Sequence, residues 1–307
     1  FKQQVEQHRQ LIKKEFDYDA TTFRNTELIY NNELARVVES LGYKTILAEG
    51  ADKILDGRSP NYVYQPKGCN KLKLLLRNYR LADDVAFRFS ESSWVEYPVY
   101  ADKYAKWLHS LHGQADVINL FMDFETFGEH QWQESGIFEF LSHMPDQVLQ
   151  HSEYSFMTPS EVGQKLQPVA ILDVPSFMSW ADVDRDLSAW RGNDLQEDAL
   201  LAVYALEKDV YAVSDPEMLA TWRSLLTSDH FYYMCTKYAA DGDVHKYFNP
   251  YRSPYDAYIN YQNIISDFAL EVAKKKQLLQ KTMPDEANNV VDRVLGFFRK
   301  RMGVKYE

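Results

Sequence analysis

Residues 21–50 hold the feature that most constrains the fold, an alternation of strand and helix patterns. Residues 21–30 are rich in β-branched and aromatic side chains, and residues 44–50 form a second short apolar run. Between them, apolar side chains in residues 33–41 recur at helical spacing, and this pattern ends at Gly42. Strand, helix and strand in this order, joined by tight turns, predict βαβ units and a parallel sheet.

The alternation continues to about residue 185, after which the pattern becomes helical. The further strands that we expect are 72–77, 85–89, 117–122 and 154–157, and the further helices are 5–14, 103–112, 137–149, 195–226, 255–280 and 288–301. Residues 117–122 are a nearly continuous apolar run, which is typical of a strand buried on both faces. We therefore expect an α/β domain over residues 1–185 and a helical region over residues 186–307.

Composition excludes several classes of partner. The formal net charge of −11 disfavours a nucleic acid, and no apolar run approaches the ~20 residues that cross a membrane. Cys69 and Cys235 are far apart and offer neither a disulfide framework nor a metal-ligand spacing, so we expect a reducing, cytoplasmic environment. Aromatic residues make up 14% of the chain. Flat rings with polar edges stack well on sugars, but most of them fill cores.

Carboxylates stand at the ends of three expected strands. They are Glu27, Glu49 and Asp123, and strand ends are where catalytic groups collect in parallel α/β proteins. Each of them can equally form an ion pair or cap the next helix, so one carboxylate alone leaves both interpretations open. Two carboxylates in one cleft suit glycoside hydrolysis, in which one attacks the anomeric carbon and the other protonates the leaving oxygen.

The segment that follows the long apolar run is rich in ionisable side chains. Asp123 is followed by Glu125, Glu129 and His130. Such a group can bind a metal ion, but the i, i+4 histidine pair of helical zinc sites is missing and no second histidine cluster lies nearby in sequence. We therefore expect neither a metal nor a cofactor. His130 is then a candidate for contacting a substrate hydroxyl or for orienting a carboxylate.

A third stretch mixes tryptophans with polar side chains. Trp180, Asp186 and Trp190 lie within residues 179–193. One interpretation is a capped helix start with aromatic packing. The other is a sugar subsite, with indole faces for stacking and polar groups for the many hydroxyls of a sugar. The residues alone leave both open.

Four sequence blocks carry a resemblance to a known family. They are residues 23–30, 56–62, 121–130 and 179–196. In this order they resemble glycoside hydrolase family 57, in particular its intracellular α-amylase-type branch. The resemblance implies an α/β fold, an incomplete, TIM-like (β/α)7 barrel followed by a helical bundle. It therefore implies a partial barrel over residues 1–185 and the bundle over residues 186–307.

The resemblance also implies a glycosidase, with hydrolysis of α-1,4-glucosidic bonds by double displacement as the expected reaction. By motif, Glu27 becomes the nucleophile and Asp123 the general acid, while Glu49 keeps a supporting or structural role. The expected partner is an α-glucan or a maltooligosaccharide. The residues that we then expect to bind substrate are Arg24, Glu125, His130, Trp180, Asp186 and Trp190.

Alternatives to hydrolysis stay open. The covalent intermediate can pass to a sugar, as in a 4-α-glucanotransferase or a branching enzyme, and the same architecture can serve a non-catalytic glucan-binding protein. A metal-dependent deacetylase needs an Asp/His/His ligand set that we cannot assemble. The chain also starts beyond the family's first two blocks, a His-Gln-Pro strand and a Glu/His-containing strand. We therefore expect an open barrel, inactive as a fragment, and no pattern indicates the oligomeric state.

Overall fold

The computed structural model describes residues 1–237 and 249–282. The chain divides into two units, Phe1–Leu187 and Ser188–Glu307, where the sequence placed a boundary after residue 185. The helix expected over residues 288–301 lies outside the described residues.

The first unit is built on a mixed sheet. Its described strands are β1 (Thr22–Arg24), β2 (Thr45–Glu49), β3 (Tyr64–Pro66), β4 (Lys73–Arg77) and β5 (Ala170–Leu172), in the order β1-β2-β4-β3-β5. β1, β2 and β4 are parallel, but β3 is antiparallel to β4 and parallel to β5. Only residues 67–72 join β3 to β4, and so short a connection reverses the chain, because a parallel crossover needs roughly a dozen residues. The expected parallel sheet is therefore mixed.

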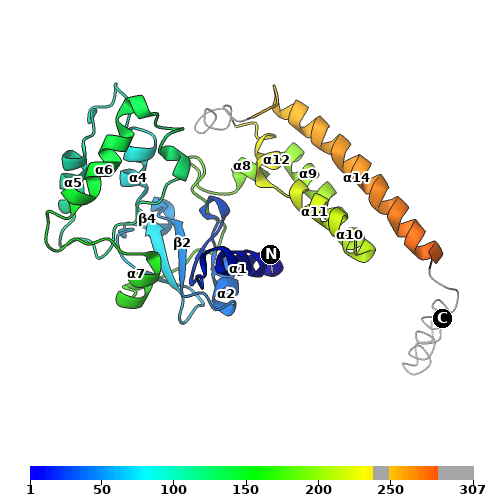
Figure 1. Ribbon diagram of the computed structural model, residues 1–307, viewed down its shortest axis with the longest axis horizontal. Coiled ribbons are helices and arrows are strands. Elements are labelled where there is room, and N and C mark those ends of the chain that lie inside the picture. The colour runs from blue at the N-terminus through cyan, green and yellow to red at the C-terminus, as the bar shows by residue number, and fades with distance from the viewer. Residues whose placement is uncertain (238–248, 283–307) are drawn as a thin grey trace. The chain divides into compact units, whose positions relative to one another are not determined.

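Helices cover both faces of β2 and β4, which lie side by side (Figure 1). Leu74 and Leu76 pack in one cluster with Val38, whereas Leu75 packs in another with Val162. The three leucines are fully buried, as expected for a strand between two helical layers. The α-helices of the first unit are α1 (Lys2–Phe16), α2 (Asn32–Ser40), α3 (Asp52–Leu55), α4 (Tyr79–Ala86), α5 (Ala101–His109), α6 (Ile137–Val148) and α7 (Pro159–Lys165).

The strand expected over residues 21–30 is interrupted. β1 is followed at once by a 3-10 turn, η1 (Thr26–Leu28). Glu27 and Leu28 have left-handed backbones, with φ of 53° and 49°, and a chain in that conformation cannot continue an extended strand. The turn therefore sets the direction of the expected nucleophile.

The strand expected over residues 85–89 is wrong, because its first part belongs to α4. Asn78 caps this helix, its side-chain oxygen accepting a hydrogen bond from the Leu81 N–H at 3.2 Å. Ala82 and Val85, three positions apart, share the buried face. A cap and a helical period thus outweigh the strand preference of single residues.

Residues 117–122 and 154–157 do not form the expected strands either. Asn119 makes one isolated parallel bridge to Arg77, and its side-chain amide donates to the Leu76 carbonyl at 2.9 Å. The Asn78 N–H also donates to the Asn119 carbonyl at 2.9 Å, so one residue docks this segment where a longer backbone ladder was expected. Residues 154–157 lead directly toward the N-cap of α7.

The second unit is helical in its described part. The pattern expected over residues 195–226 is divided in three. The first break is at Leu206, which is the C-cap of α9. At the second break, Ser214 ends α10 with a left-handed backbone (φ 56°) and Pro216 begins α11 behind the cap of Asp215. The α-helices of this unit are α8 (Ser188–Arg191), α9 (Asp194–Ala205), α10 (Glu207–Val213), α11 (Pro216–Leu225), α12 (Ser228–Tyr232) and α14 (Pro254–Thr282).

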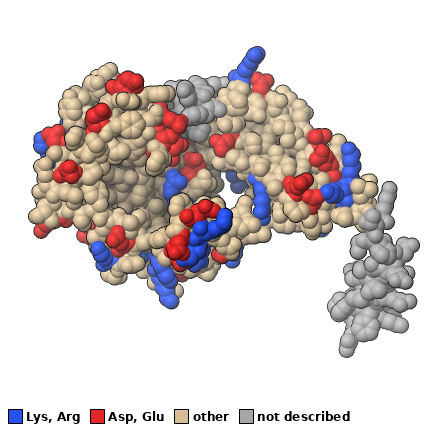
Figure 2. All heavy atoms as spheres, in the orientation of Figure 1, with Lys and Arg blue, Asp and Glu red and all other residues tan. Residues whose placement is uncertain are grey.

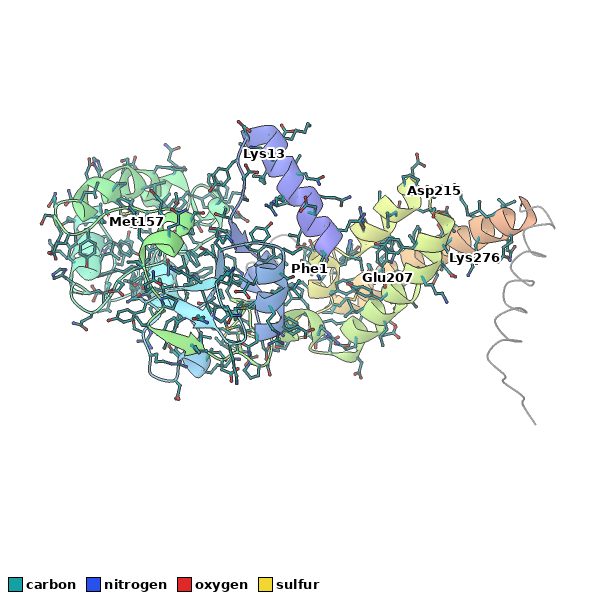
Figure 3. The ribbon with its side chains drawn as sticks, turned by 90° about the horizontal axis from the view of Figure 1, so that it is seen from below. Phe1, Lys13, Met157, Glu207, Asp215 and Lys276 are labelled. Carbon is teal, nitrogen blue, oxygen red and sulfur yellow. The ribbon has the colours of Figure 1, made fainter. Side chains whose placement is uncertain are left out.

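α14 packs along α9 and α10. Lys276 pairs with Asp209, and Lys275 pairs with Asp215, so the long helix is tied to its neighbours by charge as well as by apolar contact. Figure 3 labels Lys276 on α14 and Asp215 at the start of α11. The buried residues of α14 recur three or four positions apart, which is the signature of an amphipathic helix. They are Ala257, Tyr261, Ile265, Phe268 and Val272.

Candidate active site

Charged side chains end three parallel strands at one edge of the sheet. β1 ends at Arg24, β2 at Glu49 and β4 at Arg77. The parallel pairing puts these carboxyl ends at the same edge, with Glu49 opposite Arg77 in register. This is the edge at which parallel α/β proteins bind ligands.

Glu27 lies on η1, just beyond the end of β1, and Trp180 holds it at two points. The indole Nε1 of Trp180 donates to Glu27 Oε2 at 2.8 Å, and the Trp180 backbone N–H donates to the Glu27 carbonyl at 3.0 Å. The left-handed backbone of Glu27 is of the kind that clusters at functional sites. A distant tryptophan thus fixes the expected nucleophile.

Arg24 connects this tryptophan to Asp123. Its guanidinium lies 4.7 Å from the centre of the Trp180 ring, a cation–π contact. Its Nη2 is 4.0 Å from Asp123 Oδ1, and both side chains are partly exposed. Glu27 and Asp123 therefore belong to one cluster, joined through Trp180 and Arg24.

The environment of Asp123 raises its pKa above the usual value. Burial raises the pKa of the Asp123 carboxyl, and the negative charge of Glu125 raises it further. The positive charges of Arg24, His130 and Arg77 oppose this shift of the pKa only in part. A raised pKa makes a carboxyl group better suited to general acid catalysis.

Arg77 is a buried member of the cluster that the sequence analysis passed over. Its three nitrogens donate to the Phe121 carbonyl at 2.6 Å, to Glu49 at 3.1 Å and to Asp83 at 2.5 Å. Its guanidinium lies 5.4 Å from the centre of the Trp180 ring. A sequence signal did exist, because a cation directly after an apolar strand is as unusual as a carboxylate there.

Glu49 is enclosed by this network. Its side chain is fully buried, accepts from the Gly50 N–H at 2.6 Å, and lies 3.9 Å from Arg185. Burial raises the pKa of Glu49, while Arg77 and Arg185 lower it. Glu49 and Arg77 therefore form a buried ion pair that supports the fold.

Glu125 and His130 lie in the loop that carries Asp123. The Glu125 carbonyl accepts from the backbone N–H of Glu129 at 3.1 Å and of His130 at 3.0 Å, which makes the loop a tight turn. The charges of Glu125 and His130 act on the pKa of Asp123 in opposite directions. Their contacts with substrate stay a prediction.

The remaining candidates, Asp186 and Trp190, belong to different units of the chain. The Asp186 carbonyl accepts from Ser179 Oγ at 2.6 Å, which ties it to the segment before Trp180. Trp190 belongs to the second unit, where its ring packs against Tyr232 and is only 8% exposed. This burial agrees with the interpretation in which Trp190 serves aromatic packing. Its stacking on a sugar, like the contact of Asp186 with one, stays a prediction.

Other classes of site can be checked against the described residues. No group of three or more His, Cys, Asp or Glu side chains among them is placed to hold a metal ion. None of the helices in residues 1–237 and 249–282 combines the length and apolarity needed to cross a membrane. Lys and Arg are dispersed among Asp and Glu on the face drawn in Figure 2.

Comparison with known proteins assigns the family. The sequence pattern of "Glycosyl hydrolase family 57" matches residues 1–175. The chain belongs to glycosyl hydrolase family 57. This family-57 chain is 44% identical over 303 residues to a protein named "Putative alpha-amylase" from Methanocaldococcus jannaschii, a match that covers 95% of the chain and 63% of that protein.

Two solved structures resemble the family-57 chain. A GH57-type branching enzyme from the archaeon Pyrococcus horikoshii matches with a TM-score of 0.59 and 13% identity over 89% of this chain and 65% of its own. A 4-alpha-glucanotransferase from Thermococcus litoralis matches with a TM-score of 0.48 and 19% identity over 74% of this chain and 34% of its own. The branching enzyme shares the fold. The family-57 chain spans only part of the length of each of these proteins.

Proposed function

We propose that the protein containing this chain is a retaining glycosidase that hydrolyses α-1,4-glucosidic bonds in α-glucans. The observation that carries the proposal is a pair of carboxyl groups in unlike environments, joined by Trp180 and Arg24. Glu27 accepts a hydrogen bond from an indole N–H, whereas burial raises the pKa of Asp123. A carboxylate that is oriented by a hydrogen bond, as Glu27 is, suits a nucleophile. A carboxyl group with a raised pKa, as in Asp123, suits a general acid.

In the first step, Glu27 attacks the anomeric carbon as the glycosidic C–O bond breaks. Asp123 gives its proton to the leaving oxygen, and a glucosyl ester of Glu27 remains. Trp180 orients the attacking carboxylate through its bond to Oε2. Arg24, 4.0 Å from Asp123, lies closest to the negative charge that Asp123 acquires.

In the second step, Asp123 takes a proton from a water molecule, and that water attacks the anomeric carbon. The bond to Glu27 breaks, Glu27 leaves as a carboxylate, and two inversions give net retention. Arg77 acts as a positioning residue, because it holds the Phe121 carbonyl of the segment that leads into Asp123 and also packs near Trp180.

The same proposal includes the type of barrel, the cellular environment and the residues that contact substrate. The fold shared with the branching enzyme supports interpreting the mixed sheet as part of a (β/α)7 barrel, followed by a helical region over residues 186–307. Cys69 and Cys235 are both free thiols, which suits a reducing, cytoplasmic environment. The proposed substrate contacts are Arg24, Glu125, His130, Trp180, Asp186 and Trp190.

The test replaces each carboxylate in the full-length protein. We expect Glu27→Gln and Asp123→Asn each to lower kcat on maltoheptaose by roughly a hundredfold or more, the usual contribution of such a group. Glu134→Gln, at an exposed position in the 3-10 turn η3 (Gln133–Ser135), is the control and keeps the wild-type rate. Unchanged turnover in the first two variants would remove these residues from the mechanism.

Product analysis separates the neighbouring activities. Hydrolysis gives shorter maltooligosaccharides that start in the α configuration, which is visible by NMR before mutarotation. Longer or branched products would instead assign glucan transfer, because a sugar would then be intercepting the covalent intermediate. Binding of glucan by the intact wild type without any turnover would favour a non-catalytic role.

A further inference from the structure

A hollow of about 390 Å³ opens at the residues that directly follow Glu49 and Arg77. Its wall includes Gly50, directly after β2, and Asn78, directly after β4. It therefore lies at the same carboxyl edge of the parallel strands as Arg24, Glu49 and Arg77, where ligands bind in this class of fold. Its volume falls in the range of small-molecule sites, roughly 300–1,000 Å³.

The backbone after β2 passes very close to the end of β4 at this point. A Cβ on Gly50 would lie 2.2 Å from the Arg77 carbonyl oxygen, so only glycine lets the ends of β2 and β4 approach as they do. The Gly50 N–H also donates to Glu49. The wall of the hollow is thus continuous with the buried Glu49–Arg77 network.

A carboxylate, a phenol and a guanidinium line the hollow as one hydrogen-bonded group. Asp52 Oδ2 accepts from the Tyr79 hydroxyl at 2.8 Å and from Arg80 Nη2 at 3.2 Å. The Asp52 and Arg80 side chains are 62% and 73% exposed, which leaves both within reach of a ligand. The bond from Tyr79 and the contact with Arg80 lower the pKa of Asp52, so it stays an ionised acceptor.

We propose that this hollow binds a glucosyl unit of an α-glucan chain, with Asp52 and Arg80 holding neighbouring hydroxyls; the proposal rests on the glycosidase function above. A carboxylate accepts from one hydroxyl and a guanidinium donates to the next, so the pair matches adjacent sugar hydroxyls. Tyr79 adds an aromatic ring whose position is set by Arg185, 4.1 Å from the ring centre.

A neutral ligand fits these groups better than an anion. Two arginines line the hollow, but Arg58 donates to the carbonyls of Leu55 and Ile54 at 2.7 and 3.1 Å. Arg80 is paired with Asp52, whose own charge repels an anion. The cationic groups are therefore already engaged, and a sugar meets both donors and acceptors without a net charge of its own.

The experiment measures binding apart from turnover. In the full-length protein carrying Glu27→Gln, maltoheptaose affinity is determined by calorimetry, with and without Asp52→Ala or Arg80→Ala. We expect each of these changes to weaken binding by about tenfold or more, the size of one lost charged hydrogen bond. Lys106→Ala, which removes a cation from an exposed carboxylate pair in α5, is the matched control and leaves the affinity unchanged.

Three results would overturn the subsite. One is wild-type affinity in both variants, and another is an equal loss in Lys106→Ala. The third is competition of inorganic phosphate with maltoheptaose, which would indicate an anion site. Because Asp52 and Arg80 are exposed, thermal unfolding of the variants is expected to match that of the parent protein.

Turnover with Glu27 intact separates this proposal from the proposed function. We expect Arg80→Ala to raise KM for maltoheptaose while kcat stays close to wild type, because the residue holds sugar away from the bond that breaks. Wild-type turnover combined with unaltered binding in the variants would sink the subsite alone. Weakened binding in the variants, with no turnover in the wild type, would sink the glycosidase function alone.

Discussion

Two arginine–carboxylate pairs stand at the same edge of the sheet and differ in exposure. Arg77 and Glu49 are 3.1 Å apart, with side chains 5% and 0% exposed, whereas Arg24 and Asp123 are 4.0 Å apart and 41% and 47% exposed. Breaking a buried pair leaves an uncompensated charge, but an exposed pair adds little to stability. The buried pair therefore supports the fold, and the loose pair leaves Asp123 able to exchange a proton.

The two pairs meet at Trp180. The Arg24 and Arg77 guanidinium groups lie 4.7 and 5.4 Å from its ring centre, and its N–H reaches Glu27. The comparison therefore predicts that the buried pair acts mainly on stability, Trp180 on the nucleophile, and the exposed pair on the pH range of activity.

The largest expected effect is on stability. Arg77→Ala is expected to lower the free energy of unfolding by about 3–5 kcal/mol, because the buried Glu49 loses its closer arginine and keeps only the longer contact of 3.9 Å with Arg185. Arg24→Ala is expected to lower it by no more than about 1 kcal/mol. Urea unfolding of both variants measures the difference. Arg77→Lys keeps the charge and is expected to lose less, and equal losses at positions 24 and 77 would break the comparison.

The next effect is on the nucleophile. Trp180→Phe keeps an aromatic ring but removes the N–H that donates to Glu27 Oε2. We expect kcat on maltoheptaose to fall by about ten- to a hundredfold, the worth of one hydrogen bond to a charged group. Steady-state kinetics tests this, with Trp132→Phe at an exposed position as the control. A loss confined to KM would mean that Trp180 only binds sugar.

The smallest effect is on pH. The general acid must be protonated, so activity falls as the pH rises through the pKa of Asp123. Burial raises that pKa and Arg24 lowers it, so Arg24→Gln moves the high-pH limb of kcat/KM upward. We expect a shift of less than about one pH unit, because the pair is exposed and screened by salt. A limb that moves downward would contradict the role of Arg24.

Local patterns predicted the longer elements. The helix expected over residues 33–41 is α2, that over 137–149 is α6, and the strand over 44–50 is β2. Their periodicity or burial is present within one segment, so no partner is needed to recognise it. β3 and β5 were missed, because each is only three residues long and exists through pairing with its neighbours.

By itself, the sequence nominated Glu27 and Asp123, as carboxylates at expected strand ends and by family resemblance. Of the three carboxylates expected there, Glu49 does end a strand, β2, whereas Glu27 lies on a 3-10 turn and Asp123 follows a segment that forms no strand. Only the tertiary structure decided what surrounds them. Trp180, 153 positions from Glu27, supplies its hydrogen bond, and Arg77 ties Phe121 to Glu49. Hydrogen bonding and desolvation depend on which distant groups come close, and no pattern within one segment carries that information.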